Sequence, residues 1–399
     1  MKKIMILGAS VLQLPAIQKA KEMGLQVIAV DMNPEAIGFK VDGVISEVIS
    51  TIDIEKVLEA AKKHDIDGIM TLASDMPMRT VAVVAKELGL VGITEDTAVK
   101  ATNKAVMREC LEQNNVPVPR FYKVHTKEEY LEAVKQFSVD CIIKPADNSG
   151  SRGVFLIDDT SDVASVEHAY EYSKQYSRSG DIVVEEYMTG PEVSVETLCV
   201  NGECHVIQIT DKLTTGAPNF VEMGHSQPSS LSQDTCEKIK EVAIAANYAV
   251  GIQNGPSHTE IKVTPNGPKI VEIGARLGGD NITTHLVPLS TGIDMVEACI
   301  NIALGEEPNI KNREEKASAI RYFKNDIGVI QSIEGIEEVK LVPGVKQISI
   351  VHDVGNSVGE IHSSVDRVGF VIAQADNQHD AIEICEKALQ LIKINVTKE

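Results

Sequence analysis

The sequence predicts a protein of mixed α/β and α+β class with several domains, and three observations carry this prediction. The chain has 399 residues, which exceeds the usual domain size of about 100–200 residues. Its first 95 residues alternate short apolar strands with helical segments, an order typical of a parallel sheet with helices on both faces. From about residue 120 the strands lengthen and the turns become richer in glycine.

Composition and charge exclude several classes of protein. No run of 18 apolar residues occurs, so we expect no membrane span and place the protein in the cytoplasm. The seven cysteines are scattered and form no CxxC pair, which disfavours both a disulfide framework and a zinc site. The formal net charge of −20 disfavours nucleic acid or an anionic membrane as a partner. An anionic ligand would therefore need local cations or backbone N–H groups.

Residues 1–95 are predicted to form a doubly wound domain. The apolar runs and helical spacings predict, in chain order, the elements Lys3–Leu7 (strand), Leu12–Met23 (helix), Val27–Val30 (strand), Ile54–His64 (helix), Gly68–Leu72 (strand) and Thr80–Leu88 (helix). Such sheets bind ligands at the carboxyl ends of their strands. We therefore predict that Ser74 and Asp75 contact a substrate amino group. The turn after the first strand lacks two glycines of the GxGxxG motif, which disfavours a dinucleotide site.

The rest of the chain is divided into two further regions, 96–310 and 311–399. A helix is predicted over Ala98–Asn114, followed by a small α+β lobe at 120–190 and a larger lobe at 191–310. In the C-terminal region the pattern predicts short strands at 345–351 and 368–373 and a helix over 379–391. No internal repeat or long linker occurs, so we expect the domains to pack closely.

A strand that delivers Lys144 to a loop of small residues predicts a phosphate site. Backbone N–H groups of a Gly- and Ser-rich loop can close around phosphate oxygens, and Lys144 would neutralise part of their charge. The loop is not a Walker A motif, because its lysine precedes the glycines. The alternative is an ordinary hairpin connection. We predict that the loop at 147–153 closes as a lid and that its phosphate contacts are Ser149, Gly150, Ser151, Arg152 and Gly153.

Two strands joined by a short connection at 182–195 predict the nucleoside site. An adenine ring can lie against such a connection, here beside Tyr187 and Met188, and bond to its backbone groups. Glu185 lies before the connection, and Glu192 after it has a carboxylate suited to ribose hydroxyls. The alternative is a pair of surface acids flanking a turn, an interpretation that is strongest for Glu186.

Two glutamates within apolar strands predict a metal site. The strands flank Thr264–Gly267, which has the composition of a hairpin turn, so Glu260 and Glu272 can be cross-strand neighbours. Adjacent carboxylates repel unless a cation lies between them, and Mg²⁺ uses one or two carboxylates together with substrate phosphates. Arg276 would point a planar cation toward the same place. The alternative is a purely structural hairpin.

These elements, in this order, resemble the ATP-grasp superfamily. The resemblance implies a Rossmann-like N-terminal domain, a two-lobed ATP-grasp fold and a small C-terminal α+β domain. It also implies ATP as cosubstrate, with Mg²⁺ or alternatively Mn²⁺ as the metal. The residues that match the family's motifs are the phosphate lysines Lys104 and Lys144, the hinge and ribose acids Glu185 and Glu192, the metal ligands Glu260 and Glu272, and the catalytic Arg276.

The segment 272–280 resembles the bacterial L-amino-acid ligase branch of that superfamily, and so does the C-terminal stretch 319–399. Gly274 stands where many members have an asparagine that helps to hold a second metal, so the number of metal ions stays open. The implied reaction is amide formation: a carboxylate attacks ATP to give an acyl phosphate, and an amine then expels phosphate. Purine-type or formate or bicarbonate ligation, and a non-catalytic ATP-binding module, are the alternatives.

Substrate contacts are predicted in the polar segment 210–228. There His225 can donate to a carboxyl group or an acyl phosphate, with a structural histidine as the alternative. Gly278 lies in a flexible turn that lets a substrate approach closely. We expect small-molecule carboxylate and amine partners, and a homodimer is left open.

Overall fold

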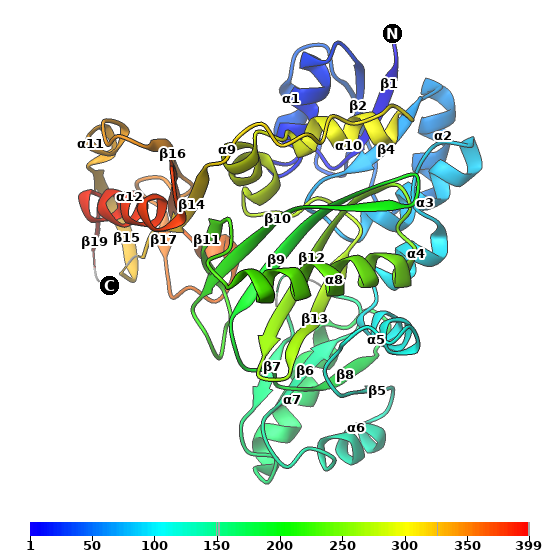
Figure 1. Cartoon of the computed structure of the whole chain (residues 1–399), viewed down its shortest axis with the longest axis vertical. Coiled ribbons are helices and arrows are strands. Elements are labelled where there is room, and N and C mark those ends of the chain that lie inside the picture. Colours follow the sequence, from blue (N-terminus) through cyan, green and yellow to red (C-terminus); the bar gives the residue numbers. More distant parts are fainter. Residues whose placement is uncertain (149, 151, 325, 398–399) are drawn as a thin grey trace.

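The computed structural model describes residues 1–148, 150, 152–324 and 326–397. The predicted phosphate contacts Ser149 and Ser151 lie outside these residues. Figure 1 shows the N-terminal domain (blue) above the long strands of the large lobe, with the small lobe below and the C-terminal region to one side. The large lobe therefore contacts each of the other parts.

The N-terminal domain is the predicted doubly wound parallel sheet, with strand order β3-β2-β1-β4. Ile4 and Ile6 of β1 pack into the same cluster as α1 and α10, whereas Met5 and Leu7 pack with α2 and α3. The short edge strand β3 was not predicted, because its residues are mostly exposed and lack an apolar pattern. The elements are β1 (Lys3–Leu7), α1 (Leu14–Glu22), β2 (Gln26–Asp31), β3 (Ile45–Val48), α2 (Ile54–His64), β4 (Gly68–Thr71) and α3 (Pro77–Leu88).

The predicted single helix over Ala98–Asn114 is wrong: the structure has two helices, α4 (Glu95–Lys100) and α5 (Lys104–Gln113). The break lies at Asn103, whose side-chain oxygen accepts the N–H groups of Ala105 and Val106 at 3.0 and 3.1 Å. An asparagine in this position caps a new helix instead of continuing the old one. Lys104 thus begins α5, and its N–H donates to the carbonyl of Ala146 at 2.6 Å, beside the predicted phosphate loop.

The small lobe is an antiparallel sheet of strand order β5-β8-β6-β7, covered by two helices. Its core contains Tyr130 of α6 and Val166 of α7, packed on strand residues such as Ile143. The elements are β5 (Phe121–Val124), α6 (Lys127–Val134), β6 (Cys141–Pro145), β7 (Phe155–Ile157), α7 (Val163–Tyr176) and β8 (Ile182–Glu186).

The large lobe provides most of a central sheet of strand order β13-β12-β9-β10-β11-β14-β18-β16. One face of this sheet is apolar: Val193 and Val195 of β9 and Ile261 of β12 share a cluster with Ile239 and Ala243 of α8. The elements are β9 (Glu192–Val200), β10 (Glu203–Thr214), β11 (Glu222–Gln227), α8 (Gln233–Val250), β12 (Gly255–Thr264), β13 (Gly267–Gly274), a π-helical turn (Ile282–Leu286), α9 (Val287–Thr291) and α10 (Met295–Ala303).

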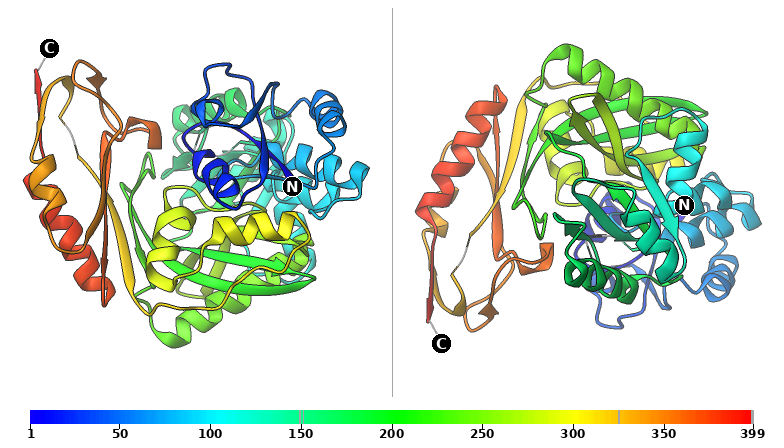
Figure 2. Two further views of the ribbon diagram at one scale, coloured as in Figure 1. Left: turned by 90° about the horizontal axis from the view of Figure 1, so that it is seen from above. Right: turned by 90° about the horizontal axis from the view of Figure 1, so that it is seen from below.

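The C-terminal region extends the central sheet, because β14 pairs antiparallel with β11. The strands β15, β17 and β19 form a separate small sheet, and α12 packs on β14 and β18. Figure 2 shows this region beside the large lobe in both views. Its elements are β14 (Ala317–Tyr322), β15 (Gly328–Glu334), α11 (Ile336–Lys340), β16 (Val345–Ile350), β17 (Ser357–Val358), β18 (Gly369–Ala375), α12 (Gln378–Leu391) and β19 (Lys393–Thr397).

Among the described residues, no single helix has the length and apolar composition needed to cross a membrane. One pair of helices, 282–291 and 295–303, meets the criterion together by length and composition, but it is bent by 113°.

Candidate active site

The predicted site residues gather on the second face of the central sheet, which is polar. Glu192, Ser194 and Glu196 alternate along β9, so their side chains share a face. In the strand pairing, the β12 residues directly opposite them are Lys262, Glu260 and His258. The sheet therefore places a row of charged side chains on this face.

Glu260 and Glu272 lie directly opposite each other on β12 and β13, as predicted. This pairing depends on a β-bulge that was not predicted. The hairpin closes with Thr264 opposite Gly267, and a regular ladder from that turn would place Val271 opposite Glu260. The register shifts between Glu260 and Ile261, and Arg108 Nη2 donates to the Val271 carbonyl at 2.6 Å. Such bulges occur beside active sites, where they redirect a side chain.

Each of these glutamates is bound by a lysine. Lys212 Nζ lies 3.0 Å from Glu260 Oε1, and Lys104 Nζ lies 2.8 Å from Glu272 Oε1. Burial alone would raise the pKa of Glu260, but Lys212 and His258 together hold that pKa well below its usual range. Glu260 is therefore ionised at neutral pH, as a metal ligand must be.

The donor set of the site fits Mg²⁺ better than it fits a metal that needs a complete protein cage. The described residues contain no group of three or more His, Cys, Asp or Glu side chains arranged to hold a metal ion. Structural zinc sites need four such ligands. Mg²⁺ is usually held by one or two carboxylates, with substrate phosphates and water completing its shell. The paired Glu260 and Glu272 meet that requirement.

Lys144 is held in place by a buried glutamate. Its Nζ lies 2.9 Å from Glu185 Oε2, and Arg108 Nε donates to the other oxygen at 2.7 Å. Glu185 is only 1% exposed. Burial would raise the pKa of Glu185, but Arg108 and Lys144 outweigh it and lower the pKa to about 2. Arg108 was not predicted, although it lies one helical turn after Lys104, where its side chain must share a face with that lysine.

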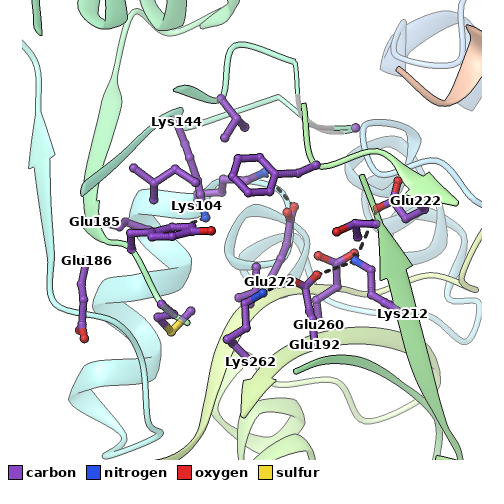
Figure 3. Close-up of a pocket in the computed structure, with 18 of the residues that line it drawn as sticks. Lys104, Lys144, Glu185, Glu186, Glu192, Lys212, Glu222, Glu260, Lys262 and Glu272 are labelled. Atoms are coloured by element: carbon purple, nitrogen blue, oxygen red, sulfur yellow. Dashed lines mark hydrogen bonds and ion pairs between the residues drawn. The ribbon is translucent and has the colours of Figure 1, made fainter. Parts of the chain in front are cut away.

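A cleft between the two lobes contains most of the predicted nucleotide residues. Figure 3 shows Lys104, Lys144 and Glu185 on one side of this cleft, facing the carboxylates of the central sheet across it. The rings of Tyr187 and Phe220, with centroids 6.1 Å apart, add aromatic surface suited to a base. Described residues that line the cleft include Lys104, Lys144, Gly150, Glu185, Tyr187, Met188, Glu192, Phe220, Glu260 and Glu272.

The structure separates the members of the predicted phosphate loop. Gly150 lines the cleft. Gly153 instead packs on α7, where its carbonyl accepts the Ser173 hydroxyl at 2.6 Å. A Cβ at Gly153 would lie 2.7 Å from Tyr176 Cβ, so this glycine is required for packing. Arg152 is exposed and does not line the cleft.

Lys212 is a site residue that the sequence analysis did not single out. Its Nζ lies 2.7 Å from Glu192, 3.0 Å from Glu260 and 3.5 Å from Glu222. Glu192, the predicted ribose acid, also accepts from Lys262 at 2.8 Å. The signal in the sequence is a lysine near the end of a long strand, since lysine is rarely buried unless it is paired.

A second cavity, of about 240 Å³, adjoins the cleft and contains Arg276. Arg276 Nε donates to Asp75 Oδ1 at 2.8 Å, and Nη2 lies 3.3 Å from Oδ2. Burial would raise the pKa of Asp75, but Arg276 outweighs it and lowers that pKa. Asp75, predicted to contact a substrate amino group, is thus engaged with Arg276. Its neighbour Ser74 does not line the cavity and accepts from Gln13 at 3.3 Å.

Gly278 lies against a buried His258–Glu196 pair. A Cβ at Gly278 would lie 2.7 Å from His258 Nδ1 and 2.9 Å from Glu196 Oε2, so no larger residue fits without a shift. His258 Nδ1 is 2.5 Å from Glu196 Oε1, and Nε2 is 3.5 Å from Glu260. Burial would lower the pKa of His258, but Glu196 and Glu260 raise it to about 9. This histidine therefore adds a positive charge behind Glu260.

The C-terminal region reaches the second cavity through Ser364, and Arg367 pairs with Asp280 of the cavity wall. Arg367 Nη1 and Nη2 each lie 2.7 Å from an oxygen of Asp280, and its guanidinium lies 3.7 Å from the Tyr322 ring centroid. Asp280 and Asn281 have φ angles of +51° and +61°, which are uncommon for residues other than glycine. The bidentate pair thus holds a strained turn at the cavity wall.

His225 lies in this cavity, where it was predicted to meet a substrate. Its Nε2 is 3.3 Å from Asp280 Oδ2. Its Nδ1 is one of the buried side-chain atoms that have no hydrogen-bond partner among the described residues. A buried polar atom of this kind is suited to a substrate group.

Replacing Arg367 by Ala should lower the free energy of unfolding by about 3 kcal/mol, because the largely buried Asp280 would lose its bidentate partner and keep only His225 beside it. Chemical denaturation measures this change. The matched control is Lys316→Ala, which removes an exposed ion pair with Asp376 and should cost less than about 1 kcal/mol. Equal losses in the two variants would contradict the structural role of the Arg367–Asp280 pair.

Replacing Lys144 by Met should weaken ADP binding by about tenfold to a hundredfold, the scale of one hydrogen bond to a charged group. Titration calorimetry with ADP measures the effect. Lys123→Met is the control, because Lys123 lies on β5 in the same lobe and does not line the cleft. Unchanged ADP affinity in the Lys144 variant would remove Lys144 from the nucleotide site.

Comparisons with known proteins agree with this geometry. Residues 137–284 match the family described as ATP-grasp domain, and residues 321–397 match the family described as L-amino acid ligase C-terminal domain 2. Residues 137–284 therefore form an ATP-grasp domain, and the chain is an ATP-dependent ligase that forms C–N bonds. Among ATP-grasp ligases it is similar to the L-amino acid ligases.

Three relatives show how far the similarity extends. An uncharacterized protein of Sinorhizobium fredii is 28% identical over 84% of this chain and 70% of its own length. The alanine–anticapsin ligase of Bacillus subtilis is 28% identical over 62% of this chain and 56% of its own length. The L-arginine-specific L-amino acid ligase of Bacillus subtilis is 24% identical over 86% of this chain and 83% of its own length.

Solved structures share the whole fold. An L-amino acid ligase from Bacillus licheniformis superposes with a TM-score of 0.86 and 24% identity, covering 100% of this chain and 99% of its own. A phosphoribosylglycinamide synthetase from Anaerococcus prevotii has a TM-score of 0.80 and 21% identity, covering 99% of this chain and 100% of its own. ATP-grasp ligases use ATP and a divalent metal, and the chain has this fold.

Proposed function

We propose that this ligase joins the carboxyl group of one amino acid to the amino group of another through an acyl phosphate. One observation carries the proposal: the Glu260–Glu272 pair lies where the nucleotide cleft meets the second cavity, and both glutamates line both spaces. An acid bound beside Arg276 would therefore lie next to the terminal phosphate of ATP. This is the juxtaposition that acyl phosphate formation needs.

The charges of the site suit a reaction between two anions. Mg²⁺ held by Glu260 and Glu272 would neutralise phosphate charge. Lys104 and Lys144, from α5 and β6, would neutralise more of it from the other side of the cleft. Arg276, oriented by Asp75, would donate to the oxyanion that develops on phosphorus and then on the acyl carbon.

The second cavity supports an amino acid as the acid substrate. Its wall carries anionic groups, among them Glu222 and Asp280, and cationic or donor groups, among them Arg276 and His225. A zwitterion presents an ammonium and a carboxylate and so complements both kinds of group. The match of 321–397 to an L-amino acid ligase domain supports the same substrate class.

The test is a phosphate-release screen with ATP, Mg²⁺ and pairs of amino acids, followed by mass spectrometry of the products. We expect phosphate release with particular pairs and a product of their combined mass less one water. Hydroxylamine added with the first amino acid alone should give its hydroxamate, which reports the acyl phosphate. A further arm contains glycine and phosphoribosylamine, and amide formation only in that arm would overturn the proposal in favour of purine-type ligation.

A further inference from the structure

Lys212 lies at the meeting point of the acids that the nucleotide and the metal would use. It projects from β10, has a side chain only 3% exposed, and contacts Glu192, Glu260 and Glu222 at 2.7, 3.0 and 3.5 Å. Figure 3 shows its side chain pointing from the central sheet into this group of carboxylates. Three carboxylates thus surround one ammonium.

We propose that Lys212 is a further catalytic residue, which shares Glu260 with the metal and neutralises the transferred phosphoryl group once the metal–nucleotide complex is bound. This inference rests on the proposed function. The Lys212 ammonium first contacts Glu260 and then contacts the phosphate.

The local charges favour such an exchange. Lys212, Lys262 and His258 together balance the three glutamates, so a divalent cation that binds Glu260 must compete with the Lys212 ammonium for it. Burial would lower the pKa of Lys212, but Glu260 and Glu192 raise it well above its usual value. A buried ammonium is stable only beside an anion, so when a metal takes Glu260 the Lys212 side chain needs another anion in its place.

The transferred phosphoryl group would be that anion. Lys212 lines both the nucleotide cleft and the second cavity. A lysine has a flexible four-carbon stem and a compact charge, so a small rotation moves the ammonium between neighbouring anions.

In the first step a substrate carboxylate oxygen bonds to the γ-phosphorus, and the bond from that phosphorus to the β,γ-bridging oxygen breaks. ADP leaves with the electron pair, and Lys212 balances charge without transferring a proton.

Lys104 shows the same arrangement on the other metal carboxylate. Its Nζ contacts Glu272 at 2.8 Å and the Asn148 carbonyl at 2.6 Å. Asn148 lies in the predicted phosphate loop, so Lys104 lies between Glu272 and the place expected for phosphates. Both metal ligands are therefore paired with lysines that face the nucleotide cleft.

The test measures Mn²⁺ alone binding to the nucleotide-free protein, by electron paramagnetic resonance. Lys212→Met leaves Glu260, Glu192 and Glu222 without their shared ammonium, so Mn²⁺ should bind at least about tenfold more tightly than to the wild type. The matched control is Lys262→Met, which removes a neighbouring lysine from Glu192. Its Mn²⁺ affinity should stay within about threefold of the wild type. In the substrate screen, Lys212→Met should release phosphate about a hundredfold more slowly.

Unchanged or weaker Mn²⁺ binding in a folded Lys212→Met protein would overturn the proposal. If that variant does not fold, Lys212→Arg is the second test. A guanidinium binds carboxylates through two donors, so this variant should bind Mn²⁺ about tenfold more weakly than the wild type. Unchanged Mn²⁺ binding by Lys212→Arg would overturn the proposal. Mn²⁺ binding needs no substrate, so its result is independent of the amino-acid screen. Absence of amide formation by the wild type would count against the proposed function alone.

Discussion

Glu272→Gln should reduce turnover by about 10²–10³-fold while the protein stays folded. The substitution keeps the shape of the side chain and removes one of two charges that would face Mg²⁺, which supplies several kcal/mol of transition-state stabilisation. Lys104, now 2.8 Å from Glu272 Oε1, would lose its ionic partner but keep the Asn148 carbonyl. Initial rates over a range of Mg²⁺ concentrations measure both kcat and the metal requirement.

The control for Glu272→Gln is Glu203→Gln, the same change at an exposed position at the start of β10. It should leave kcat and the Mg²⁺ requirement unaltered. Normal turnover of the Glu272 variant at limiting Mg²⁺ would contradict the assignment of Glu260 and Glu272 as metal ligands.

Arg276→Lys should lower kcat by about a hundredfold with little change in the KM for ATP. Lysine keeps the charge but cannot bond to both oxygens of Asp75, which Arg276 reaches through Nε and Nη2. An oxyanion develops on phosphorus and on the acyl carbon after binding, so a donor aimed at it acts mainly in the transition state. The loss of one such donor typically costs about 3–4 kcal/mol. Steady-state kinetics with saturating amino acids separate the two constants.

Asp75→Asn tests the same geometry from the other domain. It leaves Arg276 intact but removes the ion pair that orients it, so kcat should fall by about tenfold, less than in the Arg276 variant. A rise in the KM for ATP at constant kcat in Arg276→Lys would instead make Arg276 a ground-state binding residue. A larger loss in Asp75→Asn than in Arg276→Lys would assign the chemistry to Asp75 itself.

The sequence by itself predicted the features that depend on hydrophobic pattern and turn composition over short stretches of chain. Alternating strands and helices predicted the parallel N-terminal sheet, because buried parallel strands need apolar runs separated by crossover helices. The turn composition at Thr264–Gly267 predicted the hairpin that brings the two glutamate-bearing strands together. Lys144 followed from its place at a strand end before a glycine-rich loop. Each of these features is encoded within a few tens of residues.

Other features depend on contacts between distant segments, and only the tertiary structure shows them. Glu260 faces Glu272 because of a bulge at Val271, and the Val271 carbonyl accepts a hydrogen bond from Arg108 of α5. Arg276 is oriented by Asp75, 201 residues earlier in the chain.

Arg367 reaches Asp280 from the C-terminal region, 87 residues later in the chain. Lys212 on β10 meets its three glutamates because β9 and β12 lie to one side of β10 in the sheet and β11 lies to the other. Hydrophobic pattern and turn chemistry act along the chain and specify which face of each element is buried. They contain no information on which charged side chains meet across that face, because packing of the whole molecule sets those distances.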